Sequence, residues 1–196
     1  MRNPEYTRRL ILSKATSLFN TKGFKGTSLS DITKATGLTK GAIYGNFENK
    51  DALAVASFDA AINTVLLDLS KRIKVQSTAP LKLKAIIDYY SEYIHNPPIK
   101  GGCPIINTSI EADDSHPMLR FKVSTTITMI IDSLKKIITR GIDENQIIKG
   151  IDVELYATMF YATIEGAIIM ARTEGSSRSY DLIKKGLENQ INAISI

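Results

Sequence analysis

The segment from Ser28 to Phe47 most constrains what this chain can fold into. Ser28 and Asp31 have the residue types and spacing of a helix N-cap and its reciprocal partner, so a helix is expected to begin there. Gly37 fits the left-handed end of that helix, and Thr39 fits the cap of a second, shorter one over 40–45. The segment therefore predicts two short helices joined by a tight turn.

The second short helix is expected to expose a surface that is small, polar or cationic. Its helical period turns Ile43 and Phe47 inward and leaves no acidic residue pointing outward. Such a surface suits a helix in the major groove of DNA, with Lys40 and Tyr44 reaching phosphate oxygens and the smaller residues lying near base edges. An ordinary helical hairpin would fit the apolar positions equally well. The outward residues are Thr39, Lys40, Gly41, Ala42, Tyr44 and Asn46.

The residues that follow favour DNA over a plain hairpin. Asn49 and Lys50 open a long helix, and a lysine is mildly unfavourable beside the positive end of a helix dipole. A phosphate bound at this helix start would relieve that repulsion, although Asp51 offsets part of it. We therefore expect Lys50 to contact the DNA backbone.

Charge is divided unevenly along the chain. Residues 1–50 contain nine Lys or Arg and three Asp or Glu, whereas residues 51–196 contain 16 basic and 17 acidic residues. The net positive charge thus lies with the helix pair, as expected if only this region meets a polyanion. A merely soluble basic surface would give the same imbalance.

The run GFKGTSLSDITKATGLTKGAIYGNFENKDAL resembles the DNA-binding region of the TetR family of bacterial transcriptional repressors, and the resemblance covers about residues 5–58. The matching residues are Phe24 after Gly23, Thr27 and Ser28, Ile32, Ala35, Gly37, Thr39 to Gly41, Tyr44, Phe47, and Lys50 before Leu53. The resemblance implies a helical homodimer whose variable C-terminal part binds a small molecule that releases operator DNA.

The resemblance also implies which residues contact DNA. They are Thr27, Thr39, Lys40, Gly41, Tyr44, Asn46 and Lys50, and we add the cap residue Ser28 and the outward-facing Ala42. Asn46 stands where the family frequently has a histidine, which leaves its role the least defined of the set. The implied function is that of a regulator, not an enzyme, and no cofactor is expected.

The rest of the chain reads as helix throughout, with no segment of strand period, so the expected fold class is all-α with about nine helices. We place an N-terminal three-helix DNA-binding domain with a helix-turn-helix at residues 1–50. A helical effector-binding and dimerisation domain follows at residues 51–196. Outside the helix pair, the expected helices are 4–22, 50–75, 80–95, 103–113, 117–138, 152–173 and 179–193.

The helix over 152–173 is apolar on too many sides for a helix with one buried face. One partner is the core of its own chain, and the second is expected to be another copy of the chain. This helix and the last helix, from each of two copies of the chain, are expected to form a symmetric four-helix interface. Two recognition helices about 34 Å apart would then read a palindromic operator.

The effector pocket is expected among the helices of residues 80–173. Its candidates are aromatic, soft or isolated polar residues in apolar helices, each of which would also fit a plain core position. Cys103 starts a helix after two glycines, where the dipole favours a thiolate, so a thiol sensor of electrophiles or oxidants is an alternative function. The candidates are Phe58, Tyr89, Tyr93, Cys103, Asn107, Met129, Phe160 and Glu165.

Two further classes of site lack the residue pattern that they need. A hydrolytic pair of Cys103 with His95 or His116 lacks an oxyanion loop and an orienting third group. A metal site from His95, Cys103, Asp113, Asp114 and His116 lacks a standard ligand spacing. A helical small-molecule-binding protein without DNA function remains as a rival, and the uneven charge argues against it.

The single cysteine cannot form an internal disulfide, and the N-terminus does not read as a secretory leader. The most apolar stretch, 159–171, is interrupted by Glu165 and Gly166 and is too short to span a bilayer. These features predict a cytoplasmic protein without membrane contact.

Overall fold

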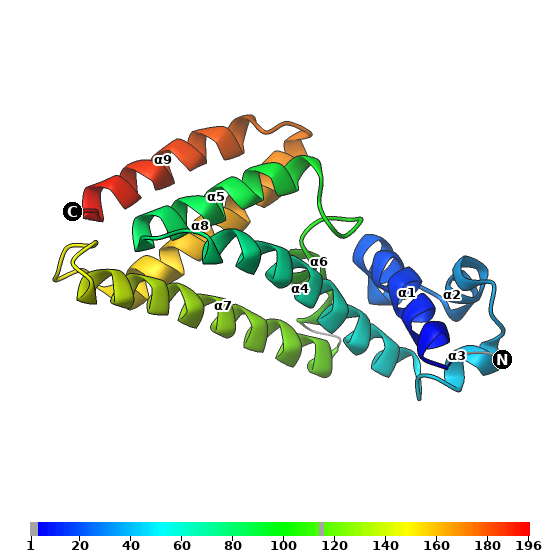
Figure 1. Cartoon of the computed structure of the whole chain (residues 1–196). Helices are drawn as coiled ribbons and strands as arrows, with labels where there is room; N and C mark the ends of the chain where they lie inside the picture. Colours follow the sequence, from blue (N-terminus) through cyan, green and yellow to red (C-terminus); the bar gives the residue numbers. More distant parts are fainter. Residues whose placement is uncertain (1–3, 114–115) are drawn as a thin grey trace. The chain divides into compact units, whose positions relative to one another are not determined.

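The computed structural model describes residues 4–113 and 116–196, and within these ranges the regular structure is nine α-helices and one isolated antiparallel bridge between Ile147 and Ser195 (Figure 1). This confirms the all-α prediction. The helices are α1 (Pro4–Gly26), α2 (Leu29–Thr36), α3 (Lys40–Tyr44), α4 (Lys50–Lys74), α5 (Ala79–His95), α6 (Pro104–Ala112), α7 (Pro117–Asp143), α8 (Val153–Glu174) and α9 (Arg178–Ile194).

The contacts divide the chain into two compact units. Unit 1 comprises residues 1–65 and 98–124, and unit 2 comprises residues 66–97 and 125–196. Two of the three boundaries fall inside helices, because α4 and α7 each contribute one end to unit 1 and the other end to unit 2, and the third lies between α5 and α6.

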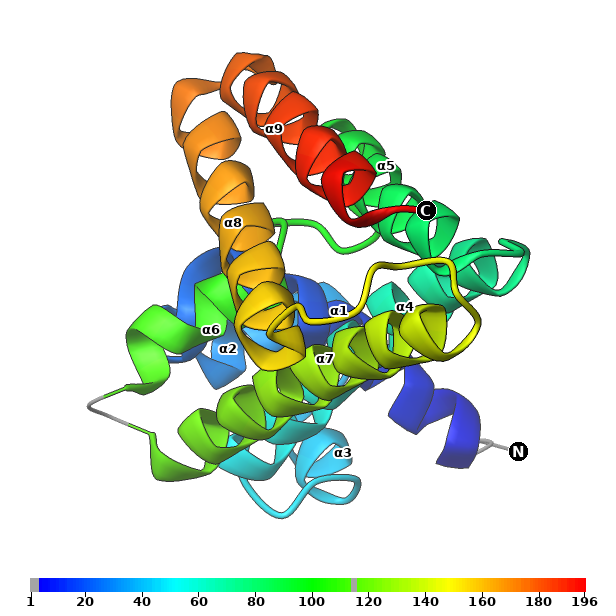
Figure 2. The same cartoon turned by 90° about the vertical axis from the view of Figure 1, so that its left-hand side faces the viewer.

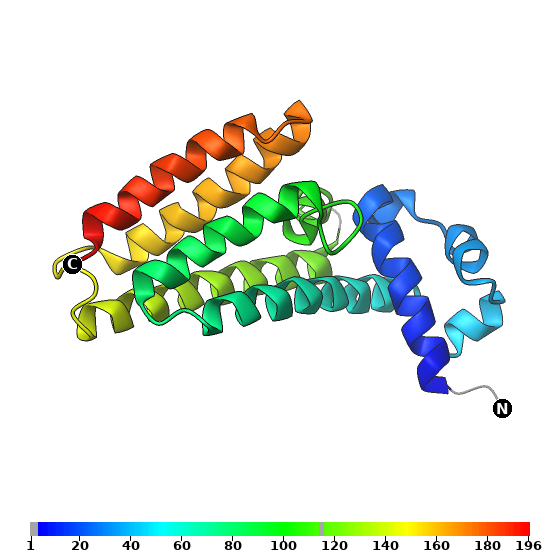
Figure 3. The same cartoon turned by 45° about the horizontal axis from the view of Figure 1, so that its top comes forward.

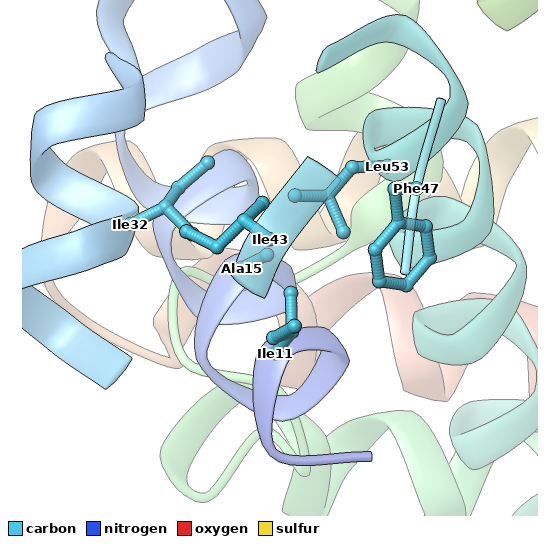
Figure 4. Close-up of a cluster of buried hydrophobic side chains, with 6 residues drawn as sticks. All are labelled: Ile11, Ala15, Ile32, Ile43, Phe47 and Leu53. Carbon is cyan, nitrogen blue, oxygen red and sulfur yellow. The ribbon is translucent and has the colours of Figure 1, made fainter. Parts of the chain in front are cut away.

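The first unit is built around a cluster of apolar side chains from α1 to α4 (Figure 4). Ile11, Ile32 and Ile43 come from three successive helices and are at most 1% exposed. Phe47 and Leu53 complete the cluster from the loop before α4 and from α4 itself. Because α3 has only five residues, it cannot be stable alone, and this packing holds it in place.

The end of α1 differs from the sequence expectation. The first helix was expected to end at residue 22, but helical geometry resumes after Gly23 and α1 continues to Gly26 across a kink. Gly23 itself has φ +75°, a conformation that strongly favours glycine. Gly37 takes the left-handed C-cap of α2 as predicted, with φ +68°.

The second unit contains an antiparallel pair, α8 and α9, with α5 packed against both (Figures 2 and 3). Tyr180 of α9 donates a hydrogen bond from its hydroxyl to the carbonyl oxygen of Ile87 on α5, at 2.7 Å. Burial raises the pKa of Tyr180 far above that of a free phenol, so the hydroxyl keeps the proton that it donates. Lys184 of α9 pairs with Asp88 of α5 on the surface of the same contact.

Two helices, α4 and α8, are long and apolar enough to cross a membrane by length and composition alone. Core helices of globular proteins pass the same test, and each of these two contributes buried residues to its unit, such as Leu53 and Phe160. The apolar stretch of α8 was expected to be too short to span a bilayer, whereas the whole helix passes the length and composition test; 44% of the apolar window of α4 and 33% of that of α8 is buried inside the protein.

Candidate DNA-binding surface

The start of α2 has the capping arrangement that the sequence predicts. The Ser28 hydroxyl accepts a hydrogen bond from the Asp31 amide at 3.1 Å, and the Asp31 carboxylate accepts from the Ser28 amide at 2.9 Å. Lys22 of α1 lies 2.7 Å from the same carboxylate, and this ammonium holds the pKa of Asp31 well below its usual range. The ionised Asp31 carboxylate thus caps the start of α2 and also connects α2 to Lys22 of α1.

The next helix, α3, is fixed at both ends. At its start the Thr39 hydroxyl accepts from the Ala42 amide at 3.2 Å. At its end the Asn46 side-chain amide donates to the Ala42 carbonyl oxygen at 2.8 Å, and the carbonyl oxygen of Asn46 accepts from Arg8 of α1. The Arg8 guanidinium also lies 4.2 Å from the centre of the Phe47 ring. Arg8 therefore supports α3 from the side of α1.

The outer face of α3 is exposed and has no acidic residue. Thr39, Lys40, Gly41 and Tyr44 are exposed, while Ala42 and Asn46 are half-buried. A Cβ atom added to Gly41 would meet only the Thr39 hydroxyl, at 4.0 Å, so nothing in the protein's own packing requires glycine there. Glycine costs a helix roughly 1 kcal/mol relative to alanine. Gly41 thus lowers the stability of α3 without serving its internal packing.

One of the residues assigned to DNA contact by resemblance is not on this surface. The Thr27 side chain is 0% exposed, and its hydroxyl donates to backbone carbonyl oxygens of Gly23 at 2.7 Å and Leu18 at 3.3 Å. This burial contradicts a direct side-chain contact, because the hydroxyl is already used to join the end of α1 to the start of α2. We therefore remove Thr27 from the set.

Lys50 lies at the start of α4 and is half-buried. Its ammonium nitrogen is 4.3 Å from the centre of the Phe24 ring, an aromatic contact that orients the lysine stem. Asn49 caps the same helix, since its side-chain oxygen accepts from the Ala52 amide at 2.7 Å. The helix start is thus ordered by the protein, and Lys50 forms no ion pair with any described residue.

Residues distant in sequence hold the end of α1. Both carboxylate oxygens of Glu111 on α6 accept hydrogen bonds, from the amides of Phe24 and Lys25, each at 2.5 Å. The approach is so close that a Cβ atom on Gly23 would clash with a carboxylate oxygen of Glu111. Sequence reasoning missed this contact, because nothing local marks Glu111 as an acceptor for amides 86 and 87 residues away.

A second connection joins the same two helices. Asn20 of α1, 8% exposed, donates from its side-chain amide to the carbonyl oxygens of Lys100 and Gly102. Asn107 of α6 donates in return to the Asn20 carbonyl oxygen at 3.0 Å. The sequence signal for this connection was the pair Thr16 and Asn20, two polar residues four positions apart. The structure shows that both are buried in α1.

Replacing Glu111 with alanine is expected to destabilise the first unit by about 1–2 kcal/mol, because two amides at the kink of α1 lose a charged acceptor at a half-buried position. Chemical denaturation measures the change. Glu111→Gln, which keeps one acceptor oxygen, should lose less. Glu48→Ala removes an exposed carboxylate of the same unit and serves as the control with almost no change. Equal stability of the Ala variant and the parent would contradict the role assigned to Glu111.

The candidates for an effector pocket fall in different places. In the second unit, Met129 and Phe160 line a cavity of about 390 Å³ that is bounded by side chains of α4, α5, α7 and α8. Tyr89 and Tyr93 are buried in α5 but do not line it, whereas Tyr90 does. Glu165 is half-buried on α8 and is not part of the wall.

The remaining candidates lie in the first unit. Phe58 and Asn107 line a small space of about 30 Å³, which is enough for about one water molecule. Cys103 is the N-cap residue of α6 and is 5% exposed. Such burial does not favour a fast-reacting thiol, which argues against the sensor alternative.

No three His, Cys, Asp or Glu side chains gather closely enough to hold a metal ion within residues 4–113 and 116–196. Asp114, one of the five residues considered for such a site, lies outside these ranges.

Comparison with known proteins decides the family. Residues 11–56 match the family model described as bacterial regulatory proteins, tetR family, and residues 79–187 match the one described as tetracyclin repressor-like, C-terminal domain. The chain belongs to the TetR family. This TetR-family protein is a DNA-binding transcriptional regulator and not an enzyme, as the sequence predicted.

Individual relatives agree with this assignment over nearly the whole chain. A TetR-family transcriptional regulator from Cytophaga hutchinsonii is 36% identical, with a TM-score of 0.91 and coverage of 100% of this chain and 98% of that one. The fatty acid metabolism regulator protein of Bacillus subtilis (strain 168) is 26% identical over 93% of this chain and 90% of its own length. The HTH-type transcriptional repressor DhaR of Mycobacterium sp. (strain GP1) is 24% identical over 89% of this chain and 86% of its own length.

Proposed function

We propose that this protein is a cytoplasmic, homodimeric repressor that binds a palindromic operator through α3 and leaves it when a small molecule binds unit 2. The observation that carries the DNA-binding part is the exposed, acid-free face of α3, where Gly41 is not required by internal packing. The proposed contacts are Ser28, Thr39, Lys40, Gly41, Ala42, Tyr44, Asn46 and Lys50.

These residues divide by chemistry. Lys40, Tyr44 and Lys50 have cationic or hydroxyl groups on side chains long enough to reach phosphate oxygens. Thr39, Gly41 and Ala42 are small and allow α3 to approach base edges. Ser28 and Asn46 already form hydrogen bonds inside the protein. These bonds orient the two side chains for additional contacts with DNA at the two ends of the proposed surface.

The dimer is supported by a stripe of exposed apolar residues on α8 and α9. Leu155, Met159 and Ile169 on α8 are 46–56% exposed, and Leu182 on α9 is 61% exposed. At Gly166 and Gly186 an added Cβ would meet nothing within 4 Å, so the same face also allows close helix approach. A monomer rarely leaves such a stripe in water, and a second copy would cover it symmetrically.

Selection of bound duplexes from a random library tests the proposal. We expect a palindromic consensus sequence. The affinity for it should fall steeply with salt, and each phosphate contact should contribute about 0.9 to the slope of log affinity against log salt concentration. Lys50→Ala should reduce this slope by about 2, because a dimer loses one phosphate contact in each subunit, and it should weaken binding to all DNA sequences alike. Thr39→Ala and Lys40→Ala should also change the preferred bases. Lys71→Ala, an exposed lysine of unit 2, is the control. An affinity independent of salt would contradict the proposed surface.

A further inference from the structure

The second unit contains a cavity of a size suited to a small organic molecule. Its volume is about 390 Å³, within the range of known small-molecule sites. All of its lining residues belong to unit 2. If the effector of the proposed function binds there, the chemistry of the wall indicates what kind of molecule it is.

The interior of this cavity is apolar. Leu69, Ile86, Leu134, Phe160 and Ile164 line it and are each at most 8% exposed. No aspartate or glutamate is among the lining residues. A ligand therefore gains by placing an apolar body against this wall, and a cationic ligand finds no counter-charge there.

Two cations border the same cavity. Lys74, in the last turn of α4, and Lys136, on α7, line it and are themselves exposed. Their sequence neighbours are engaged elsewhere, because Arg72 pairs with Glu92 and Lys135 pairs with Asp132 and Glu154. By contrast, Lys74 and Lys136 have no ion pair with any residue that the structure describes.

Two hydroxyl groups lie close in sequence to these cations. Ser70 precedes Lys74 by one helical turn, and Ser133 precedes Lys136 by three residues on α7; both serines line the cavity. The Ser133 hydroxyl donates to the carbonyl oxygen of Met129 at 2.8 Å, so its own oxygen is free to accept. The exposed side of the cavity thus offers positive charge next to polar groups.

From this arrangement we infer that the cavity binds an amphipathic organic anion. Its apolar body lies against the buried wall of α5, α7 and α8, and its single carboxylate-like head group lies near Lys74 and Lys136. This inference rests on the proposed effector-binding role of unit 2 and adds the chemical class of the effector. The apolar contact supplies most of the affinity, and the two lysines select the sign of the head group.

Three probes with the same ten-carbon chain test the inference on the full chain: decanoate, 1-decanol and decyltrimethylammonium, each below the concentration at which it forms micelles. Their affinities are measured by displacement of an environment-sensitive dye at pH 7.5, where decanoate is ionised. We expect decanoate to bind about tenfold more tightly than decanol at low salt, and the cation to bind most weakly. The preference should shrink as salt is added. Equal affinity for the three probes would overturn the inference.

The double variant Lys74→Gln with Lys136→Gln locates the selectivity. It should bind decanoate and decanol almost equally while keeping the affinity of the parent for decanol. The matched control is Lys71→Gln with Lys149→Gln, which removes the same charge from exposed positions of unit 2 outside the cavity. An unchanged preference for decanoate in the first variant, or an equal loss in the control, would contradict the assignment.

A separate measurement distinguishes this inference from the proposed function. Operator binding is measured with and without decanoate. Selective binding of decanoate without release of DNA would support the anion site and overturn release by this class of molecule. Release of DNA by decanol and decyltrimethylammonium as readily as by decanoate would support a regulatory cavity but overturn its selectivity for anions.

Discussion

Leucine in place of Gly41 is expected to lower the affinity for operator DNA about a hundredfold or more without destabilising the protein. The protein has room for the side chain, because a Cβ atom at this exposed position would meet only the Thr39 hydroxyl, at 4.0 Å. Leucine also favours the helix over glycine by roughly 0.8–1 kcal/mol. In a dimer two such side chains would hold both recognition helices away from the bases, and each lost base contact costs about 1–3 kcal/mol.

The measurement pairs an operator titration with thermal unfolding of the same sample. Gly41→Ala should fall between the parent and the leucine variant in DNA affinity. Asn63→Leu places the same leucine side chain at an exposed position of α4 and should leave DNA binding intact. If Gly41→Leu bound operator as tightly as the parent, α3 could not be the element that enters the groove.

Alanine in place of Ile43 is expected to destabilise the first unit by about 2–4 kcal/mol. Ile43 is 1% exposed and packs with Ile11, Ile32 and Phe47 in the cluster of Figure 4. It is the buried residue of the five-residue α3, so its truncation leaves a cavity beneath the recognition helix and removes the packing that keeps α3 helical. DNA affinity should fall together with stability.

Urea denaturation of the full chain measures the stability change, and Ile110→Ala is its control. That substitution removes the same atoms from an isoleucine that is 82% exposed, so it should change stability by no more than about 0.5 kcal/mol. Similar losses for the two variants would show that burial in the cluster does not determine the contribution of Ile43.

Helix positions were predictable from the sequence because their signals are local. The caps at Ser28 and Thr39 and the left-handed Gly37 lie within a few residues of the backbone groups that they satisfy, and the structure has all three. Gly23 was misread for the opposite reason. A glycine at positive φ normally ends a helix, but here Glu111, from a distant segment, accepts from the amides that follow the kink and allows helical geometry to resume.

The cavity of unit 2 was only partly predictable. Met129 and Phe160 were selected as soft and aromatic residues in apolar helices, but Tyr89 and Tyr93 share that description and face elsewhere. Which face of a helix borders a cavity depends on where other helices pack, and periodicity in one helix does not contain that information. Lys74 and Lys136 were missed because an isolated lysine on a helix usually reads as a solvated surface residue.

The position of Glu111 bears on how this regulator can be engineered. A fragment that stops at residue 65 retains every helix of the recognition motif, yet it lacks the carboxylate that satisfies the Phe24 and Lys25 amides and the Asn107 amide that holds Asn20. The recognition motif is therefore not a self-contained cassette. A chimaera that transplants its operator preference onto another sensor must carry residues 98–124 with it.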